Sequence, residues 1–422
     1  MDSTQKQMIL KQAFRAAVES VKPRHFMKDV VSTLAQKQGD KRLHLIAFGK
    51  AAGDMCAEYK RAGGQFEKAL VVVPHNVDIQ FDDEAITLCH SAHPVPDEAS
   101  LQAARKALAF AKELGEDDML VVLISGGGSS LVCAPPIGIS LADKMTVNQA
   151  LLASGAPIQE MNIVRRHLSA FKGGRLTLAA YPARVISFAL SDVPGDDPAA
   201  IASGPTVGDA STAEQAIAIL ERYKIKVPES ISSWLASADC ESPFPDDSLF
   251  DSHEMHIMAS ANIALQAAAD SVTKAGYKAV IIGDSFQINS RAMADLLMQE
   301  IDKLPAGTAL ISGGETSVEV TGTGCGGRNA ECAHALALYD RDDICGIVGD
   351  SDGVDGAAEV AASLFHAGLI DQANSLGLDA KAMLENNDSH SFFLALDSQL
   401  ITGPTQTNVN DIRIILKGAA QT

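Results

Sequence analysis

Short runs of hydrophobic residues alternate with helical periods along most of the chain, and several of the runs end in glycine-containing turns. Helical spacing of apolar positions covers 4–38 and recurs between the runs that follow. Short buried strands that alternate with helices are typical of a parallel, doubly wound sheet. The pattern therefore predicts an α/β fold, with strands in the first half of the chain at 43–50, 69–75, 85–97, 118–130 and 183–198.

The second half repeats this alternation after an irregular segment. Residues 237–253 are rich in Ser, Pro and Asp and lack apolar periodicity, which indicates a domain boundary nearby. A chain of 422 residues is also long for one hydrophobic core. We therefore expect two α/β domains, residues 1–250 and 251–422, with strands in the second at 256–260, 278–285, 308–314, 317–322, 344–350 and 411–416.

Charge and cysteine content narrow the class of protein. The formal net charge is −19, which makes nucleic acid and anionic membranes poor partners. The acidic excess is concentrated in residues 251–422, which hold 9 Lys and Arg against 23 Asp and Glu. The seven cysteines form no CxxC pair, and neither a signal peptide nor a membrane span is apparent. These features favour a cytoplasmic protein with reduced thiols.

Two turns carry candidate groups for binding phosphate. The first turn is the loop of Gly126, Gly127, Gly128, Ser129 and Ser130. Its glycines would let the backbone approach a ligand, and its two hydroxyls would add hydrogen-bond donors. Lys50, between Gly49 and a pair of alanines at a strand end, can neutralise an anion or can simply be solvated. The apolar-Ser-Gly-Gly pattern of the first loop recurs later in the chain, at Gly313, Gly314 and Glu315.

The densest basic cluster lies at 162–175. Asn162, Arg165 and Arg166 share one face of an expected helix, where guanidinium groups can bind a carboxylate or phosphate, or can form surface salt bridges. Asp192 follows an apolar strand, and the carboxyl ends of such strands face the ligand crevice of α/β sheets. It is a candidate ligand for Mg²⁺ or a group that orients a substrate hydroxyl.

A literal GxGxxG motif occurs at 322–327, before an expected helix, with Asp350 at the end of the next strand. This spacing is similar to a dinucleotide-binding fingerprint, although the motif lies deep in the chain. Arg328 follows the motif and would oppose the helix dipole, which favours an anionic ligand that compensates it. Asp350 is a candidate contact to Mg²⁺ or to a ribose, or part of a capped turn.

Together these segments resemble the class II glycerate 2-kinases, whose C-terminal module is called MOFRL. The resemblance spans nearly the whole chain, and Gln406 is one departure, where glycine is expected. It implies a Rossmann-like first domain, an active site in the interdomain cleft, and transfer of the ATP γ-phosphoryl group to the 2-hydroxyl of D-glycerate. The family's critical Lys and Arg match Lys50 and Arg328. The stretches that carry the resemblance are 48–52, 93–97, 123–130, 162–176, 191–197, 201–206, 311–316, 322–331, 350–356 and 402–411.

The expected mechanism places ATP and Mg²⁺ beside Lys50 and Arg328, with Asp192 and Asp350 as candidate metal ligands. Asn162, Arg165 and Arg166 would hold the glycerate carboxylate. Both glycine turns are candidate nucleotide contacts, and Gly126–Ser130 is favoured. Two other functions stay open: an NAD(P)H-dependent hydroxypyruvate reductase that uses 322–327, and a sensor without catalysis. A homodimer is a possible assembly.

Overall fold

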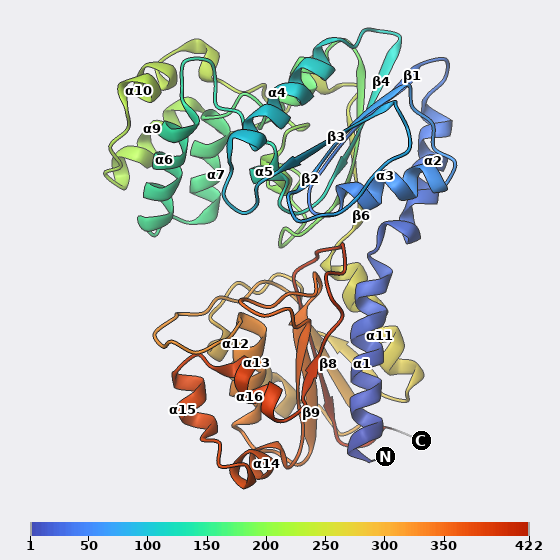
Figure 1. Ribbon diagram of the computed structural model, residues 1–422, viewed down its shortest axis with the longest axis vertical. Helices are drawn as coiled ribbons and strands as arrows, with labels where there is room; N and C mark the ends of the chain where they lie inside the picture. The colour runs from blue at the N-terminus through green and yellow to red at the C-terminus, as the bar shows by residue number, and fades with distance from the viewer. Residues whose placement is uncertain (1, 421–422) are drawn as a thin grey trace. The chain divides into compact units, whose positions relative to one another are not determined.

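The computed structural model describes residues 2–420, which fold into two compact units. One unit contains residues 23–258, and the other combines the residues up to Lys22 with those from Ala259 onward. The second unit is therefore built from both ends of the chain, which lie near each other in it (Figure 1). Each unit has its own six-stranded sheet, so the chain is α/β, as predicted.

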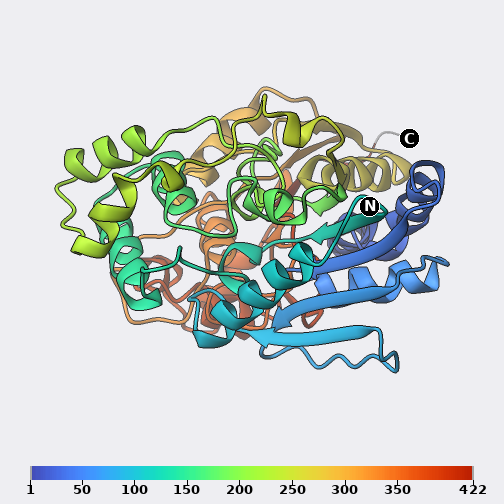
Figure 2. The ribbon, with the colours of Figure 1, turned by 90° about the horizontal axis from the view of Figure 1, so that it is seen from above.

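The sheet of unit 23–258 has the order β3-β2-β1-β4-β5-β6. Its first five strands pair in parallel, and the blue-to-cyan strands lie side by side in Figure 2. The central strands are buried on both faces, which explains their continuous apolar runs. The strands are β1 (Arg42–Phe48), β2 (Lys68–Pro74), β3 (Ile86–Ser91), β4 (Asp118–Ile124), β5 (Arg184–Leu190) and β6 (Glu254–Ala259).

Helices cover both faces of this sheet. Figure 1 shows α4 (Glu98–Lys112) on one face and α2 (Pro23–Lys37) and α3 (Ala52–Arg61) on the other. A separate helical cluster with its own apolar core lies beside the sheet and consists of α6 (Leu141–Ala153), α7 (Ile158–His167), α9 (Ala213–Arg222) and α10 (Glu229–Leu235). Short helices complete the unit: α5 (Gly128–Leu131), α8 (Arg175–Ala180) and the 3₁₀ turns Ile201–Ser203, Ala238–Cys240 and Ser248–Phe250.

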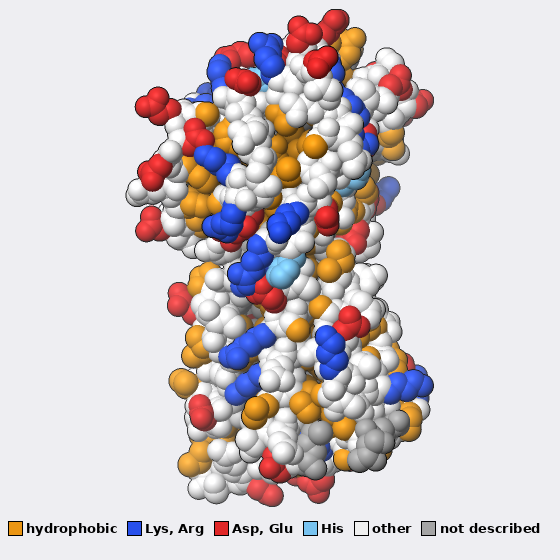
Figure 3. Space-filling model, turned by 90° about the vertical axis from the view of Figure 1, so that its right-hand side faces the viewer, with side chains coloured by type: hydrophobic (Ala, Val, Ile, Leu, Met, Phe, Trp, Pro, Cys, Tyr) orange, Lys and Arg blue, Asp and Glu red, His pale blue; other side chains and the backbone are white. Residues whose placement is uncertain are grey.

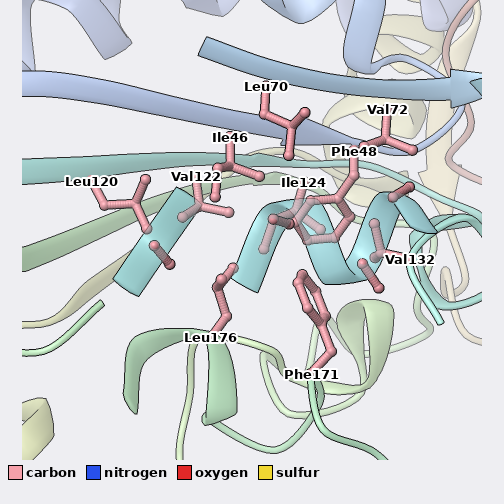
Figure 4. Packing of buried hydrophobic residues seen from close by; sticks show 14 of the residues in the cluster. Ile46, Phe48, Leu70, Val72, Leu120, Val122, Ile124, Val132, Phe171 and Leu176 are labelled. Atoms are coloured by element: carbon pink, nitrogen blue, oxygen red, sulfur yellow. The ribbon is translucent and has the colours of Figure 1, made fainter. Parts of the chain in front are cut away.

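The core of the parallel sheet supports the ends of β1 and β4. Figure 4 shows Phe171 pointing toward Phe48, and the two rings meet edge to face with centroids 5.7 Å apart. Ile124, at the end of β4, and Leu176 belong to the same buried cluster. Phe48 lies just before Gly49 and Lys50, and Phe171 lies just before Lys172. The packing of the two rings therefore fixes the start of both segments.

The second unit has a mixed sheet of order β11-β10-β9-β12-β8-β7. Only β7 and β8 pair in parallel among its described strand pairs. Helix α1 packs along α11, whereas α12 and α13 lie on the other face of the sheet (Figure 1). The elements are α1 (Ser3–Ser20), α11 (Ala261–Lys274), β7 (Lys278–Ile281), α12 (Ser290–Asp302), β8 (Thr308–Ser312), α13 (Arg328–Ala337), β9 (Ile344–Asp350), β10 (Ala362–Phe365), α14 (Leu369–Ser375), α15 (Ala380–Glu385), α16 (Ser389–Ala395), β11 (Gln399–Leu400) and β12 (Asp411–Lys417).

Four details differ from the sequence expectations. The strand expected at 256–260 in the second domain is β6, which lies in the sheet of β1–β5. The helical pattern at 4–38 is two helices that break before Pro23, because the residue before a proline avoids helical geometry. The expected strand at 317–322 is wrong: that segment has one isolated bridge, between Asn289 and Ser317, and Val320 is exposed. Strands β10 and β11 were not predicted, being only four and two residues long.

Candidate active site

Close packing and a backbone hydrogen bond join the turn that follows β1 to the turn that follows β4. Gly49 has φ of +129°, and a Cβ there would lie 2.1 Å from the hydroxyl oxygen of Ser125. The backbone N–H of Lys50 donates to the carbonyl of Gly126 at 2.8 Å. Strands β1 and β4 are neighbours at the point where the strand order reverses, which is where doubly wound sheets bind ligands. Lys50 and the first glycine loop therefore lie where the fold favours a site.

Three chemically active side chains converge on the glycines of this loop. A Cβ on Gly126 would lie 2.3 Å from a carboxylate oxygen of Asp192. A Cβ on Gly127 would lie 2.8 Å from the ring of His93 and 3.4 Å from Cγ of Lys50. The glycines are thus required by close contact as well as by the φ of +79° at Gly127. Lys50 and Asp192, predicted separately from sequence, contact adjacent residues of one loop.

A pocket of about 280 Å³ opens beside this loop. Its wall combines the predicted Gly127, Ser129 and Ser130 with the predicted Arg165. It is smaller than the ~300–1,000 Å³ typical for drug-sized ligands, so it suits a small molecule. The rest of its lining consists of His93, Pro94, Val95, Pro96, Cys133, Lys144, Met145, Asn148, Gln149, Leu152 and Lys172.

Lys172 is one of two buried lysines that line this pocket. Its side chain donates to the hydroxyl of Ser129, whose oxygen lies 3.1 Å from that of Ser203. Burial and the neighbouring positive charge of Lys144 lower the pKa of Lys172 to about 7, and Arg165 acts in the same direction. The ammonium of Lys172 is therefore poorly compensated by its surroundings.

The two arginines predicted to bind substrate have different environments. Arg165 lines the pocket and donates weakly to the side-chain oxygen of Asn162, at 3.5 Å. Arg166 instead forms an ion pair with the fully buried Asp209, with Nε and Oδ2 2.9 Å apart, and donates to Ser211. The structure therefore brings Arg165 to the pocket, whereas Arg166 holds α7 against the segment that leads into α9.

In the other unit, Arg328 begins α13 and bridges two carboxylates. Its Nε donates to Oδ1 of Asp411 at 2.8 Å, and a terminal nitrogen donates to Oδ2 of Asp350 at 2.5 Å. Although burial acts to lower it, the pKa of Arg328 is raised by Asp411, Asp350 and Glu315. The expectation that an anionic ligand must compensate Arg328 therefore loses its basis, because carboxylates of the protein already do so. About a quarter of the side chain remains exposed.

Asp411 is the hub of this cluster and was not singled out from sequence. Besides Arg328, it accepts hydrogen bonds from Asn329 at 2.7 Å, from the backbone of Thr316 at 2.9 Å and from the buried Arg413 at 2.5 Å. Asp355 supplies the cap of α13 by accepting the N–H groups of Asn329 and Ala330. These contacts fix the position of the first turn of α13.

The other candidates in this unit have largely structural surroundings. Burial, Asp352 and Asp411 raise the pKa of Asp350 well above its usual range, against the effect of Arg328. A Cβ on Gly314 would lie 2.3 Å from the carbonyl oxygen of Phe286, so this glycine permits close backbone packing. Gly313 accepts a hydrogen bond from Arg413, and the exposed Glu315 lies 3.9 Å from Arg328.

The GxGxxG segment is occupied by contacts within the protein. The N–H groups of Gly322, Thr323 and Cys325 donate to side-chain oxygens of residues 386–388, and that of Gly324 donates to the carbonyl of Asn386. A dinucleotide-binding loop needs such N–H groups to face the pyrophosphate, and it follows a strand of a βαβ unit. Neither condition is met here, so the segment is not a dinucleotide fingerprint.

Sequence reasoning missed some groups around both clusters. Lys172 belongs to the basic segment 162–175 and has no motif of its own, and Lys144 lies in α6 without any motif. Asp411 and Arg413 stand on one strand in an alternating pattern that was read only as strand. All four are charged residues in buried positions, and this becomes apparent only in the fold.

These two sheets and their loops define a two-domain α/β family. Residues 9–236 match the family described as a domain of unknown function, DUF4147, and residues 308–411 match the MOFRL family. The chain belongs to this DUF4147–MOFRL family, as its resemblance to the glycerate 2-kinases predicted.

Several relatives of this chain carry enzyme names. It is 36% identical to a D-glycerate 2-kinase of Thermotoga maritima, over 95% of each chain. It is 33% identical to a human glycerate kinase, over 88% of this chain and 84% of that protein. A protein of Agrobacterium vitis with the provisional name hydroxypyruvate reductase is 41% identical, over 97% of this chain and 94% of its own.

Solved structures agree with these sequence relatives. A crystal structure of a Thermotoga maritima glycerate kinase superposes with a TM-score of 0.87 at 34% identity, covering 98% of this chain and 99% of the other. A Pyrococcus horikoshii protein gives 0.83 at 30% identity, covering 99% and 100%. The similarity therefore extends over both units.

Residues 2–420 contain neither a helix that could span a membrane nor a cluster of metal-ligating side chains. No helix in that range is long and apolar enough to cross a membrane. No group of three or more His, Cys, Asp or Glu side chains there is arranged to hold a metal ion. On the face drawn in Figure 3, basic and acidic side chains are interspersed.

Proposed function

We propose that this protein transfers the γ-phosphoryl group of ATP to the 2-hydroxyl of D-glycerate, giving 2-phosphoglycerate and ADP. The observation that carries the proposal is the small cationic pocket beside Lys50 and the first glycine loop, in a chain whose relatives include a D-glycerate 2-kinase. D-Glycerate is a small anion with a hydroxyl next to its carboxylate, so it is small enough for the pocket and opposite to it in charge.

In phosphoryl transfer an enzyme contributes mainly positive charge and the positioning of the reactants. We assign the neutralisation of the transferring group to Lys50 and, on the family resemblance alone, to Arg328, whose charge Asp411 and Asp350 already compensate. The loop Gly126–Ser130 would contact the phosphates of ATP, and Arg165 would bind the substrate. Arg166 is less suited to that role, because its guanidinium is committed to Asp209. Gly313, Gly314 and Glu315 are secondary candidates for nucleotide contacts.

The residues around the loop fit a bound Mg²⁺. This ion needs only one or two carboxylates when phosphate oxygens and water complete its shell. Asp192 offers a carboxylate oxygen so close to the loop that only glycine fits at position 126. It would hold Mg²⁺ or orient the 2-hydroxyl. Mg²⁺ would supply charge to the phosphates. Asp350 is a weaker candidate, since Arg328 occupies one of its oxygens.

A hydroxypyruvate reductase is the second candidate function, favoured by the name of the Agrobacterium vitis relative. The structure weakens it, because the N–H groups of the GxGxxG segment donate to residues 386–388. A sensor that binds without turnover is the third candidate.

One pair of assays separates these candidates. Release of ADP from ATP and Mg²⁺ should depend on D-glycerate, whereas hydroxypyruvate should cause no oxidation of NADH. Oxidation of NADH without phosphoglycerate would favour the reductase, and binding without either reaction would favour the sensor.

A cytoplasmic location and a homodimer also belong to the proposal. The location is supported by the seven cysteines, all of which are free thiols. Size-exclusion chromatography with light scattering would determine whether two copies associate.

A further inference from the structure

The pocket beside the first glycine loop contains three basic side chains that have no acidic partner among residues 2–420. They are Lys144, Lys172 and Arg165, and both lysines are almost completely buried. Lys144 donates to the carbonyl of Leu168 at 2.6 Å, and Lys172 donates to the hydroxyl of Ser129. The residues that line the pocket include no Asp or Glu.

This arrangement is electrostatically costly without an anion. Buried lysines are normally paired, because burial of an uncompensated charge is unfavourable. Here the groups that face Lys172 are mostly cations: Lys144 from α6 and Arg165 and Arg166 from α7, with the thiol of Cys133 as the opposing influence. An anion in the pocket would offset this repulsion. The positive charge of the pocket therefore favours binding of an anionic ligand from solution.

We propose that Lys172, together with Arg165, binds the carboxylate of the acid substrate, with Lys144 adding positive charge behind them. The assignment rests on the proposed function and names the part of the site that selects an acid. The hydroxyl of Ser129 positions the Lys172 ammonium by accepting its hydrogen bond. Apolar side chains such as Met145 and Leu152 form another wall.

The position of the pocket relative to the loop supports this orientation. Gly127 lines the pocket, and a Cβ at this position would lie close to Cγ of Lys50 and to the ring of His93. A carboxylate bound at Lys172 would therefore leave the rest of a three-carbon acid directed along the loop. The hydroxyl to be phosphorylated would lie on the side of Lys50 and Asp192.

The proposal has a consequence for pH. An anion raises the pKa of Lys172 above its value of about 7 in the free protein, so binding takes up a proton above that pH. Affinity for D-glycerate should then fall as pH rises from about 7, by up to tenfold per pH unit. Lys144, Arg165, Arg166 and Cys133 also face this group and will shape the curve.

The test compares the whole protein with its Lys172→Met variant. Binding of D-glycerate is measured by calorimetry without nucleotide, and KM values for D-glycerate and ATP by ADP release, at pH 6, 7, 8 and 9. A lost hydrogen bond to a charged group is worth ~1.5–3 kcal/mol, so the affinity for D-glycerate should fall roughly 10- to 150-fold. The KM for ATP should stay within about twofold, and the pH dependence of binding should flatten. Lys112→Met, on an exposed face of α4, is the matched control and should behave like wild type.

Equal affinity and equal pH dependence in wild type and Lys172→Met would overturn the assignment. Because methionine replaces an uncompensated ammonium, the variant should melt no lower than wild type. If it nevertheless fails to fold, Arg165→Gln provides the same measurement, and an unchanged affinity there overturns the proposal. If wild type binds D-glycerate through Lys172 without phosphorylating it, the proposed function fails and the pocket assignment stands. If it phosphorylates D-glycerate and Lys172→Met keeps the same KM, only the pocket assignment fails.

Discussion

Replacement of Arg328 by methionine removes the positive charge that lies between two buried carboxylates of the unit that contains α13. Asp411 would keep its hydrogen bonds from Asn329, Thr316 and Arg413, so its charge stays compensated. Asp350 would keep the hydrogen bond that it accepts from the backbone N–H of Asp352 at 2.9 Å. The energetic cost of the substitution therefore falls mainly on Asp350.

The size of that cost follows from burial. Breaking a buried ion pair by removing one partner costs ~3–5 kcal/mol. Burial already raises the pKa of Asp350, so this carboxyl can take up a proton instead. Relative to an unfolded Asp with a pKa of about 3.9, that uptake costs about 3 kcal/mol at pH 6, which limits the loss at that pH to about 3 kcal/mol. For domains of this size each kcal/mol shifts the melting temperature by about 2–4 °C, so the unit should melt about 6–12 °C lower.

The assay is thermal melting followed by circular dichroism, since Trp234 is the only tryptophan and reports on the other unit. Adding Asp350→Asn to Arg328→Met should recover most of the loss, because the uncompensated carboxyl is then gone. Arg341→Met is the control: it breaks a more exposed pair with Asp343 and should cost no more than about 1 kcal/mol. An Arg328→Met protein that melts within 2 °C of wild type, or one that Asp350→Asn does not rescue, would refute this reasoning.

Three further outcomes are expected. Arg328→Lys should lower kcat by about 10²–10³ with little change in the KM for ATP, because an ammonium cannot reproduce the guanidinium fork; a kcat within threefold of wild type, measured below the melting temperature, would sink the catalytic role. Gly126→Ala should push the carboxylate of Asp192 out of place, since its Cβ would lie 2.3 Å from Oδ2; we expect a raised Mg²⁺ requirement in a folded protein, and an unchanged Mg²⁺ titration would count against Asp192. Without ligand, wild type should gain stability relative to Lys172→Met as pH rises from about 7 toward 10.5, by up to about 1.4 kcal/mol per pH unit, because the unfolded chain binds the additional proton in that window; parallel pH profiles in Trp234-monitored denaturation would contradict the low pKa of Lys172.

The parts of the fold that sequence predicted are those whose signal is local. Strands β1 and β4 are continuous apolar runs, because both faces of a parallel sheet are covered, and each is followed within two residues by a glycine that the turn requires. The segment 317–322 alternates like a half-buried strand, yet it lies as a loop, because no strand pairs along it beyond one bridge at Ser317. Short strands such as β10 depend on distant partners and carry little pattern of their own.

The same distinction applies to the site. Lys50 and the loop Gly126–Ser130 were predictable, because close turns impose glycine and small residues on the local sequence. The pairing of Arg328 with Asp411 joins residues 83 positions apart, and the carbonyl that holds Lys144 lies 24 residues away. Such contacts form when distant segments pack together. The partners of these charged groups can therefore be identified only from the fold.

The identity of the phosphorylated product tests the central claim most directly. The full chain is incubated with ATP, Mg²⁺ and D-glycerate, and enolase is added without a mutase, so that only 2-phosphoglycerate is converted to phosphoenolpyruvate. We predict phosphoenolpyruvate in amounts equal to the ADP released. ADP release that yields phosphoenolpyruvate only after a mutase is added would show 3-phosphoglycerate as the product, and absence of any phosphoglycerate would contradict the kinase assignment itself.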